Sequence, residues 1–264
     1  MKKAIKSRYW VLFVILPLMA CATSEYNIEK NKAISKDLQR LADAYYRQGD
    51  YTNALRYYLD SEKNYPDDPE LQYQLGMTYQ EKMNYLQSEE HFRRALSLKP
   101  DLTKAKIGLS VSYLKTEDYD QAITLLKQTI EDLSFEIYTK PQYPKYLLGW
   151  AYHLKREYPE SRRYLQESLD YYSSGFPKDA IYIQALRAMG LNALAQSKPE
   201  EALSYFEKVI PFAPKWPDLY MDMARAHRLA GDATRARQAY QRVIELAPAT
   251  DLADTAAKEE ALLK

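Results

Sequence analysis

Few residues of this chain are of a type that could carry out covalent or acid–base chemistry. The 264 residues include one cysteine, Cys21, and three histidines, His91, His153 and His227. The sequence contains no HExxH zinc motif, no GxSxG nucleophile turn and no phosphate-binding glycine loop. Histidines scattered in this way are typical of core or surface positions rather than of metal ligands or catalytic bases. We therefore predict a protein that is not an enzyme and that has no catalytic residues, no metal site and no small-molecule substrate.

Cys21 ends a segment typical of a protein export signal. Positions 1–20 contain four basic residues and no acidic one, and an apolar stretch over residues 9–18 is followed by Ala20 directly before the cysteine. The stretch is too short to cross a hydrocarbon core of ~30 Å as a helix, which needs roughly 20 apolar residues. Lipid attachment explains a single cysteine at this position best. The alternatives are an ordinary cleaved signal or a signal anchor with an unrelated thiol.

The run Leu18-Met19-Ala20-Cys21 resembles the lipobox of bacterial lipoproteins, with leucine three residues before the cysteine and a small residue just before it. The resemblance implies cleavage before Cys21, a diacylglycerol on its sulfur and an acylated new N-terminus. Ala22 follows, where aspartate would favour inner-membrane retention, so we expect an outer-membrane anchor with the remaining chain in the periplasm. Two or three lipid chains, at ~0.8 kcal/mol per buried CH₂, would hold the protein permanently.

The composition favours helices and a protein partner. Without the four basic residues of positions 1–20, 33 basic residues remain against 36 acidic ones, a formal charge of −3. This balance offers no surface for nucleic acid. Because Cys21 is the only cysteine, neither a disulfide within the chain nor a zinc–cysteine site is expected, and no cofactor other than the covalent lipid is predicted. The chain has only seven glycines, and residues that favour helices dominate it.

A pattern of about 34 residues repeats six times along the chain. A small residue recurs at Ala42, Gly76, Ser110, Gly149, Gly190 and Ala224. Directly before it stands a large apolar residue: Leu41, Leu75, Leu109, Leu148, Met189 and Met223. Sixteen positions after the small residue comes a large apolar or aromatic residue: Tyr58, Phe92, Leu126, Leu165, Phe206 and Tyr240. Because residues at i, i+3, i+4 and i+7 share a helix face, this spacing predicts pairs of helices that pack through these side chains.

The pattern matches the tetratricopeptide repeat at nearly every signature position from about residue 35 to 250, without the tryptophan expected early in the first helix. The resemblance implies an all-α, right-handed superhelical solenoid of six helical hairpins with a C-terminal capping helix. The expected organisation is a signal peptide at 1–20, a lipidated N-terminus and short tether at 21–34, repeats at about 35–68, 69–102, 103–136, 142–175, 183–216 and 217–250, and the capping helix at 251–264. The tether would extend at most about 3.3–3.6 Å per residue.

Two junctions are longer than the repeat requires. The small residues are 34 positions apart except for gaps of 39 and 41, which place extra residues in 132–143 and 171–183. Insertions in solenoids map to loops or extended helix ends that either carry binding or reflect neutral drift in length. Both explanations stay open. The side chains that we single out as possible contacts are Phe135, Ile137, Tyr138 and Phe176.

The face of each first helix that the hairpin does not use would line the concave side of the solenoid. Copy one is polar there, with Gln39, Asp43, Tyr46 and Arg47, whereas the central copies are largely apolar. The predicted partner-binding groove comprises Tyr73, Met77, Val111, Leu114, Tyr143, Tyr146, Trp150, Leu154 and Leu194. Such a groove suits an amphipathic helix or an apolar peptide; alternatively, curvature buries some of these residues against the next helix. We expect Tyr146 and Trp150 to be the anchors, since aromatic residues commonly dominate interface energetics.

The lipid anchor and six repeats together resemble the type IV pilus biogenesis lipoproteins known as pilotins. The lengthened third junction, with Tyr138 and Pro141 before the run Leu148–Tyr152 (LGWAY), is similar to that family, whereas the second lengthened junction departs from it. The resemblance implies an outer-membrane scaffold that binds a secretin and promotes its localisation and assembly. Two other functions stay open: an adaptor that recruits peptidoglycan hydrolases or proteases, and a component of outer-membrane β-barrel assembly.

Overall fold

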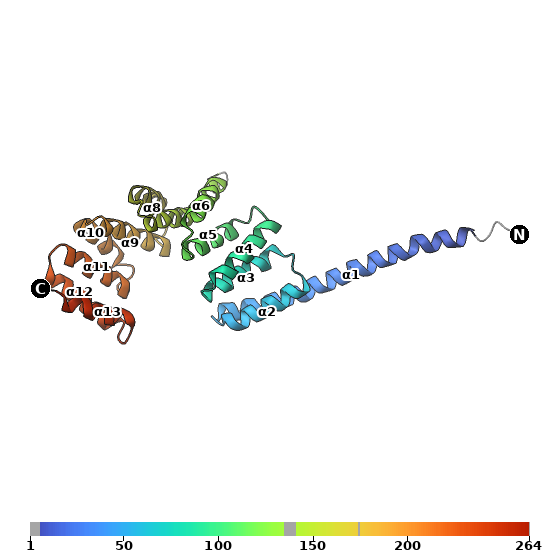
Figure 1. The fold of residues 1–264 in the computed structure, drawn as a ribbon, viewed down its shortest axis with the longest axis horizontal. Helices are drawn as coiled ribbons and strands as arrows, with labels where there is room; N and C mark the ends of the chain where they lie inside the picture. Colours follow the sequence, from blue (N-terminus) through green and yellow to red (C-terminus); the bar gives the residue numbers. More distant parts are fainter. Residues whose placement is uncertain (1–5, 135–140, 174, 264) are drawn as a thin grey trace. The chain divides into compact units, whose positions relative to one another are not determined.

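Helical hairpins make up the chain in the computed structural model (Figure 1), which describes residues 6–134, 141–173 and 175–263, with the backbone alone for 6–25 and 134. The helices are α1 (Lys6–Arg47), α2 (Tyr51–Asn64), α3 (Pro69–Glu81), α4 (Tyr85–Leu98), α5 (Thr103–Lys115), α6 (Tyr119–Ser134), α7 (Gln142–Leu154), α8 (Tyr158–Ser173), α9 (Ala180–Ala195), α10 (Pro199–Val209), α11 (Pro217–Leu229), α12 (Ala233–Leu246) and α13 (Asp251–Ala261). No strand occurs in the described ranges, and the predicted all-α solenoid of hairpins is confirmed. None of the described helices is both long and apolar enough to cross a membrane.

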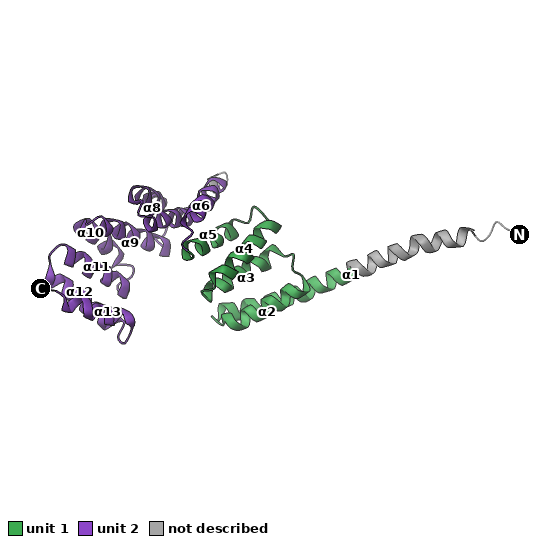
Figure 2. Cartoon of the chain, viewed as in Figure 1, with its two compact units in different colours: residues 1–116 green, residues 117–264 purple. Residues whose placement is uncertain are grey.

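The chain divides into two compact units, residues 1–116 and 117–264 (Figure 2). Unit 1 contains α1 to α5, and unit 2 contains α6 to α13. The concave-side positions predicted from the sequence are therefore divided between two bodies, and each set is described within its own unit.

The turn inside each hairpin follows from local sequence chemistry. A residue with positive φ follows the first helix of the hairpin. An acidic or amide side chain often caps the N-terminus of the second helix. Asp50 accepts a hydrogen bond from the backbone N–H of Asn53 at 3.0 Å, and Asp232 does the same for Arg235 at 2.9 Å. Such caps satisfy N–H groups that have no partner within the helix. The cap therefore fixes where the second helix of a hairpin begins.

Glycine allows the helices to approach each other where a large ring must fit. A Cβ atom on Gly76 would lie 2.7 Å from the ring of Phe92, and one on Gly190 would lie 2.3 Å from the ring of Phe206. Both phenylalanine side chains are completely buried. The pairing of a small residue with a large one, predicted from the repeat spacing, thus forms the core of a hairpin in each unit.

The two ends of the chain differ in how they are covered. Leu41 belongs to the predicted hairpin-facing set but is 41% exposed, because no repeat precedes the first one to cover it. At the other end, α13 packs Ala256 against the cluster around Tyr240. Glu259 on α13 accepts a hydrogen bond from the hydroxyl of Tyr240 at 2.9 Å and pairs with Arg225 at 2.7 Å. The last repeat is thereby covered by a helix with its own polar contacts.

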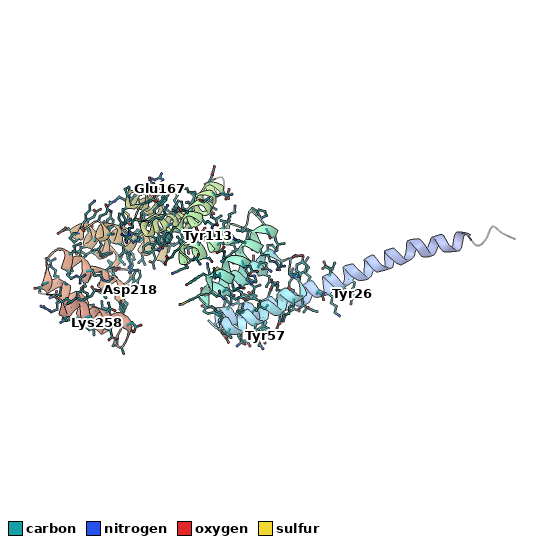
Figure 3. The ribbon with its side chains drawn as sticks, viewed as in Figure 1. Tyr26, Tyr57, Tyr113, Glu167, Asp218 and Lys258 are labelled. Atoms are coloured by element: carbon teal, nitrogen blue, oxygen red, sulfur yellow. The ribbon has the colours of Figure 1, made fainter. Side chains whose placement is uncertain are left out.

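Residues 26–34, expected to form part of an extended tether, continue α1 as a helix. The helical rise is about 1.5 Å per residue, less than half the reach of an extended chain. Tyr26 projects from this part of α1 (Figure 3) and is 70% exposed.

The extra residues of the second junction lengthen helices as well as a loop. Helices α8 and α9 on either side of it have 16 residues each, against 13 in α7 and 14 in α12. At the first junction α6 also has 16 residues, and the predicted contacts Phe135, Ile137 and Tyr138 lie outside the described residues.

Candidate protein-binding surfaces

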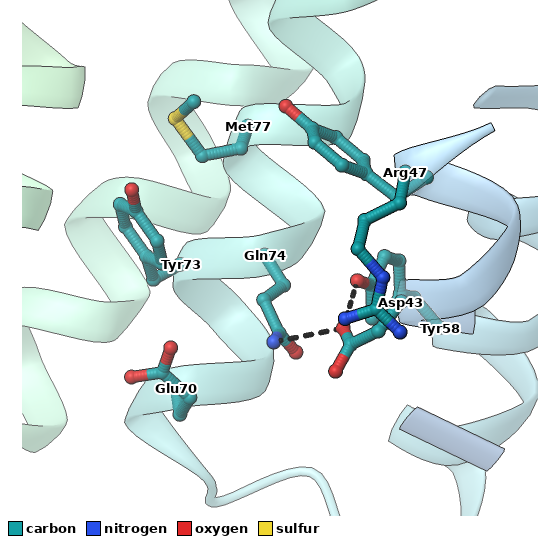
Figure 4. A pocket seen from close by; sticks show the side chains of 8 residues that line it. Asp43, Arg47, Tyr58, Glu70, Tyr73, Gln74 and Met77 are labelled. Atoms are coloured by element: carbon teal, nitrogen blue, oxygen red, sulfur yellow. Dashed lines mark hydrogen bonds between the residues drawn. The ribbon is translucent and has the colours of Figure 1, made fainter. Parts of the chain in front are cut away.

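A pocket opens in unit 1 between α1 and α3 (Figure 4). Its volume is about 240 Å³. The lining side chains are Asp43, Tyr46, Arg47, Tyr58, Glu70, Tyr73, Gln74 and Met77. The four α3 residues, Glu70, Tyr73, Gln74 and Met77, stand at i, i+3, i+4 and i+7, so they share one face of that helix.

The carboxylate of Asp43 organises one side of the pocket. Its Oδ1 accepts a hydrogen bond from the hydroxyl of Tyr58 and another from Nε2 of Gln74 at 3.0 Å, as the dashed lines of Figure 4 show. Arg47 of α1 also lines the pocket. Because Nε2 of Gln74 donates to Asp43, the amide oxygen of Gln74 takes no part in this hydrogen bond. Oε1 is buried and has no hydrogen-bond partner among the described residues.

The opposite side combines apolar surface with an ion pair. Met77 and Tyr73 contribute the apolar surface, and Nζ of Lys104 lies 4.4 Å from the centre of the Tyr73 ring. The same ammonium group is 2.5 Å from Oε1 of Glu70. The pocket therefore has a cationic group over one aromatic wall and carboxylates at two of its edges.

Two tyrosine hydroxyls of the pocket, those of Tyr46 and Tyr58, remain protonated over the physiological range. Burial, followed by the charge of Glu81, raises the pKa of Tyr46 well above its usual value. Burial, with the adjacent Asp43 as the next cause, raises the pKa of Tyr58 in the same way. Both hydroxyls consequently act as hydrogen-bond donors to carboxylates rather than as negative charges.

Sequence reasoning found only part of this pocket. Asp43 and Tyr46 were assigned to a polar end separate from Tyr73 and Met77, whereas the structure places all four around one cavity. Gln74 was missed, although its i+4 spacing from Glu70 was a signal that could have found it. Leu114, which is also predicted to line the groove, has a side chain that is only 8% exposed. Val111, on the same helix, is half-buried.

In unit 2 the corresponding face of α7 carries four rings in a row: Tyr143, Tyr146, Trp150 and His153. Tyr143 stacks on Tyr146 with ring centres 6.4 Å apart, and Trp150 stacks on His153 with ring centres 4.7 Å apart. Their spacing of i, i+3, i+7 and i+10 places them on one helix face. We call these four residues the ring row.

The ring row is partly built into the core of unit 2. Tyr143 is 36% exposed, whereas Tyr146 and Trp150 are half-buried and pack against the cluster that contains Leu165 and Leu186. Burial raises the pKa of Tyr146 to about 12. The expected anchors thus pack against the core and also keep an accessible edge.

Polar groups fix the surroundings of the ring row. Nδ1 of His153 lies 2.7 Å from Oδ1 of Asn192, and Nδ2 of Asn192 donates to the hydroxyl of Ser161 at 2.8 Å. Burial lowers the pKa of His153, so the neutral imidazole predominates near neutral pH. Nearby on α9, Nε of Arg187 donates to Oδ2 of the buried Asp222 at 2.6 Å. These contacts connect repeats four, five and six within unit 2.

The remaining predicted groove residues of unit 2 are spread apart. Leu154 and Leu194 are both half-buried. Leu194 lines a second cavity, of about 470 Å³, with Ser197, Arg225, Arg228 and Leu229. Both arginines of this cavity pair with Glu259. Phe176, from the second junction, is 48% exposed and stacks on Tyr171 with ring centres 4.3 Å apart.

The described residues hold no group of three His, Cys, Asp or Glu side chains that could bind a metal ion. Cys21 is outside this search, since its side chain is not described.

Models of the tetratricopeptide repeat match residues 40–103, 145–215 and 193–258, which together span more than half of the sequence. The chain is a tetratricopeptide-repeat protein. Such repeats typically form scaffolds for protein–protein interaction, so the surfaces above are candidate sites for a protein partner. No protein of curated function matches the sequence of this repeat protein.

Solved structures similar to this repeat protein include a type IV pilus biogenesis factor. The crystal structure of PilW, a type IV pilus biogenesis factor, has a TM-score of 0.73 at 18% identity, over 85% of this chain and 98% of that one. PilF of Pseudomonas aeruginosa has a TM-score of 0.66 at 13% identity, over 87% and 99% of the two chains. A tetratricopeptide repeat protein from Parabacteroides merdae has a TM-score of 0.70 at 14% identity, over 87% and 86%. At these identities the likeness is one of fold.

Proposed function

We propose that this repeat protein is a pilotin: a lipoprotein anchored in the outer membrane through Cys21, which binds a secretin and promotes its localisation and assembly in type IV pilus biogenesis. The repeat domain would face the periplasm and hold a secretin segment, while the lipid directs the complex to the outer membrane.

The observation that carries the proposal is similarity over the whole length of a type IV pilus protein. The match covers 98% of PilW and 85% of this chain. The lipobox-like run before Cys21 supports the membrane part of the proposal independently of the fold. The pocket of unit 1 and the ring row of unit 2 supply two surfaces of a kind that protein partners use, with exposed aromatic edges and convergent polar groups.

The membrane anchor is tested by metabolic labelling with palmitate in the bacterium that carries the gene. The wild-type chain should take up the label and fractionate with the outer membrane, whereas Cys21→Ser should do neither. Thr23→Ala, two residues away, is the matched control and should behave as wild type. A labelled Cys21→Ser variant would overturn the proposed attachment site.

The partner is tested by pull-down from detergent-solubilised envelopes. The wild-type chain should recover a secretin. The double variant Tyr146→Ala/Trp150→Ala should lose it if the ring row is the binding surface. Tyr164→Ala/Tyr205→Ala changes two half-buried rings of unit 2 outside the ring row and is the matched control. Circular dichroism establishes that each variant is folded. Recovery of peptidoglycan hydrolases, proteases or β-barrel assembly subunits in place of a secretin would contradict the proposal.

A further inference from the structure

We propose that two neighbouring loops of unit 2 form a patch that binds the anionic surface of a phospholipid membrane. This patch, which we call the loop patch, comprises Phe176 and Lys178 between α8 and α9, and Phe212 and Lys215 between α10 and α11. The inference goes beyond the proposed function, since it requires neither a lipid on Cys21 nor a secretin.

The two loops meet through their rings. Phe176 stacks on Tyr171 with ring centres 4.3 Å apart, and Phe212 packs edge-on against Tyr182 at 5.7 Å. Nζ of Lys178 lies 5.0 Å from the centre of the Tyr182 ring and 5.4 Å from that of Phe212. A side chain of one loop therefore reaches the ring of the other, and the two loops present one surface.

The exposed rings of the loop patch rest on a buried one. Phe176 and Phe212 are 48% and 43% exposed, whereas Tyr172 is only 6% exposed. The Tyr172 ring contacts those of Tyr171 and Tyr182 at 5.2 Å each, which connects the two exposed phenylalanines through a continuous series of rings. Contiguous apolar side chains that stay exposed mark a surface for a protein or a membrane.

Charge favours the membrane. Neither Lys178 nor Lys215 has an ion-pair partner in the parts of unit 2 that the structure describes. Asp179 is the only acid in these loops. Its carboxylate is engaged inside unit 2, where it accepts hydrogen bonds from the Tyr172 hydroxyl and from the N–H of Ile181. The loop patch thus presents cations beside rings, a combination that anionic headgroups attract and that membrane-surface segments share.

The backbone of the α10–α11 loop is also suited to lipid. Two of its residues are prolines, which have no N–H group. The N–H groups of Phe212 and Ala213 both donate to the carbonyl of Val209, at 3.0 and 3.1 Å. The N–H of Trp216 donates to the carbonyl of Ala213 at 3.3 Å. Acyl chains accept no hydrogen bonds, so a loop whose N–H groups are mostly absent or already paired can approach them at low cost.

The test uses the full chain in phospholipid nanodiscs, with 4-fluorophenylalanine in place of phenylalanine for fluorine NMR. The chain has six phenylalanines, of which Phe92 and Phe206 are completely buried and serve as internal references. Phe176→Leu and Phe212→Leu assign the two signals of the loop patch. In nanodiscs of phosphatidylethanolamine and phosphatidylglycerol with a nitroxide on some headgroups, these two signals should broaden severalfold more than the references.

A charge reversal tests the electrostatic part. Lys178→Glu should lose most of the broadening, and so should the wild-type chain in nanodiscs of phosphatidylcholine alone. The matched control is Lys198→Glu, which changes an exposed lysine of unit 2 beyond the other end of α9, about 24 Å along that helix, and should behave as wild type. Circular dichroism establishes that both variants are folded.

Three results would overturn the inference. The first is broadening of Phe176 and Phe212 no greater than that of the references, in both the wild-type chain and Cys21→Ser, which removes any constraint from an anchor. The second is broadening that is equal in phosphatidylcholine and unaffected by Lys178→Glu. The third is loss of a captured protein in Phe176→Ser/Phe212→Ser without lipid-dependent broadening, which would assign the loop patch to a protein partner.

Palmitate labelling and the envelope pull-down separate failure of this inference from failure of the proposed function. A labelled chain that captures a secretin but shows no selective broadening would refute the membrane contact and leave the pilotin proposal standing. An unlabelled chain without a secretin, whose loop patch broadens selectively in anionic nanodiscs, would refute the pilotin proposal and leave the membrane contact standing.

Discussion

The pocket of unit 1 and the ring row of unit 2 lie on equivalent faces of their first helices but are chemically opposite. In unit 1 this face carries carboxylates, an arginine and an unsatisfied amide oxygen around a cavity. In unit 2 it carries Tyr143, Tyr146, Trp150 and His153, with two stacked pairs of rings. Beneath both faces the hairpin core is the same, with a glycine against a large side chain. The repeat thus fixes the core and leaves the concave positions free to take different chemistry in each unit.

The largest expected effects lie in the shared core. Phe92→Ala in unit 1 and Phe206→Ala in unit 2 each remove a completely buried ring, so each should lower the free energy of unfolding by about 3–5 kcal/mol. Urea denaturation followed by circular dichroism measures both. Similar losses would support a common core under two different surfaces, whereas a negligible loss in one unit would show that the cores are not equivalent.

A smaller effect should separate the surfaces themselves. Trp150→Ala removes a ring packed against the core cluster and should cost about 2 kcal/mol, whereas Tyr73→Ala at the pocket wall should cost about 1 kcal/mol. Phe176→Ala is the control, as a ring outside both surfaces, and should change stability by about 0.5 kcal/mol or less. A larger loss for Tyr73→Ala than for Trp150→Ala would reverse the distinction between an open pocket and a partly structural ring row.

Mild acid should act on the ring row and not on the pocket. Burial lowers the pKa of His153, so the unfolded chain binds more protons near pH 6 and stability falls as the pH decreases from about 7 through the folded-state pKa. His153→Gln should reduce this dependence, as measured by thermal unfolding at a series of pH values. No histidine lines the pocket. An unchanged pH dependence in His153→Gln would contradict the assignment.

The smallest effect is expected at the uncovered end of unit 1. Leu41→Gln should change the free energy of unfolding by no more than about 0.5 kcal/mol, because the side chain is already 41% exposed. Leu148 has the same repeat position in unit 2 but is completely buried, so Leu148→Ala should cost about 2–5 kcal/mol. A large loss for Leu41→Gln would indicate that something covers this end in solution.

The core could be predicted from the sequence because its signal is periodic. The pairs Gly76–Phe92 and Gly190–Phe206 follow directly from small and large residues at fixed positions of the repeat. The exposure of Leu41 could not be predicted from its repeat position alone, since that position is covered only when another repeat precedes it. The cavity depends on how Asp43 of one hairpin meets Gln74 of the next, which is a contact between repeats that no spacing within one repeat specifies.

The lengthened junctions are visible in the sequence as gaps of 39 and 41 residues in the repeat spacing, but the form of the second one could not be predicted. In the second junction part of the added length became helix, because Tyr171 and Tyr172 continue α8 and Asp179 caps α9 through the N–H groups of Ile181 and Tyr182. Between Tyr172 and Asp179 lies the sequence Ser-Ser-Gly-Phe-Pro, which is equally compatible with a turn in place of the added helix.

The helical continuation of α1 changes the mechanics of the N-terminal connection. A flexible tether limits only the distance between a domain and its anchor, whereas a continuous helix resists bending and transmits torque. If the chain is anchored at Cys21 as proposed, residues 26–47 would act as a lever arm and set the angle at which unit 1 meets the leaflet. Inserting one residue into this arm would turn the pocket by about 100° about the helix axis with hardly any change in its distance from the membrane.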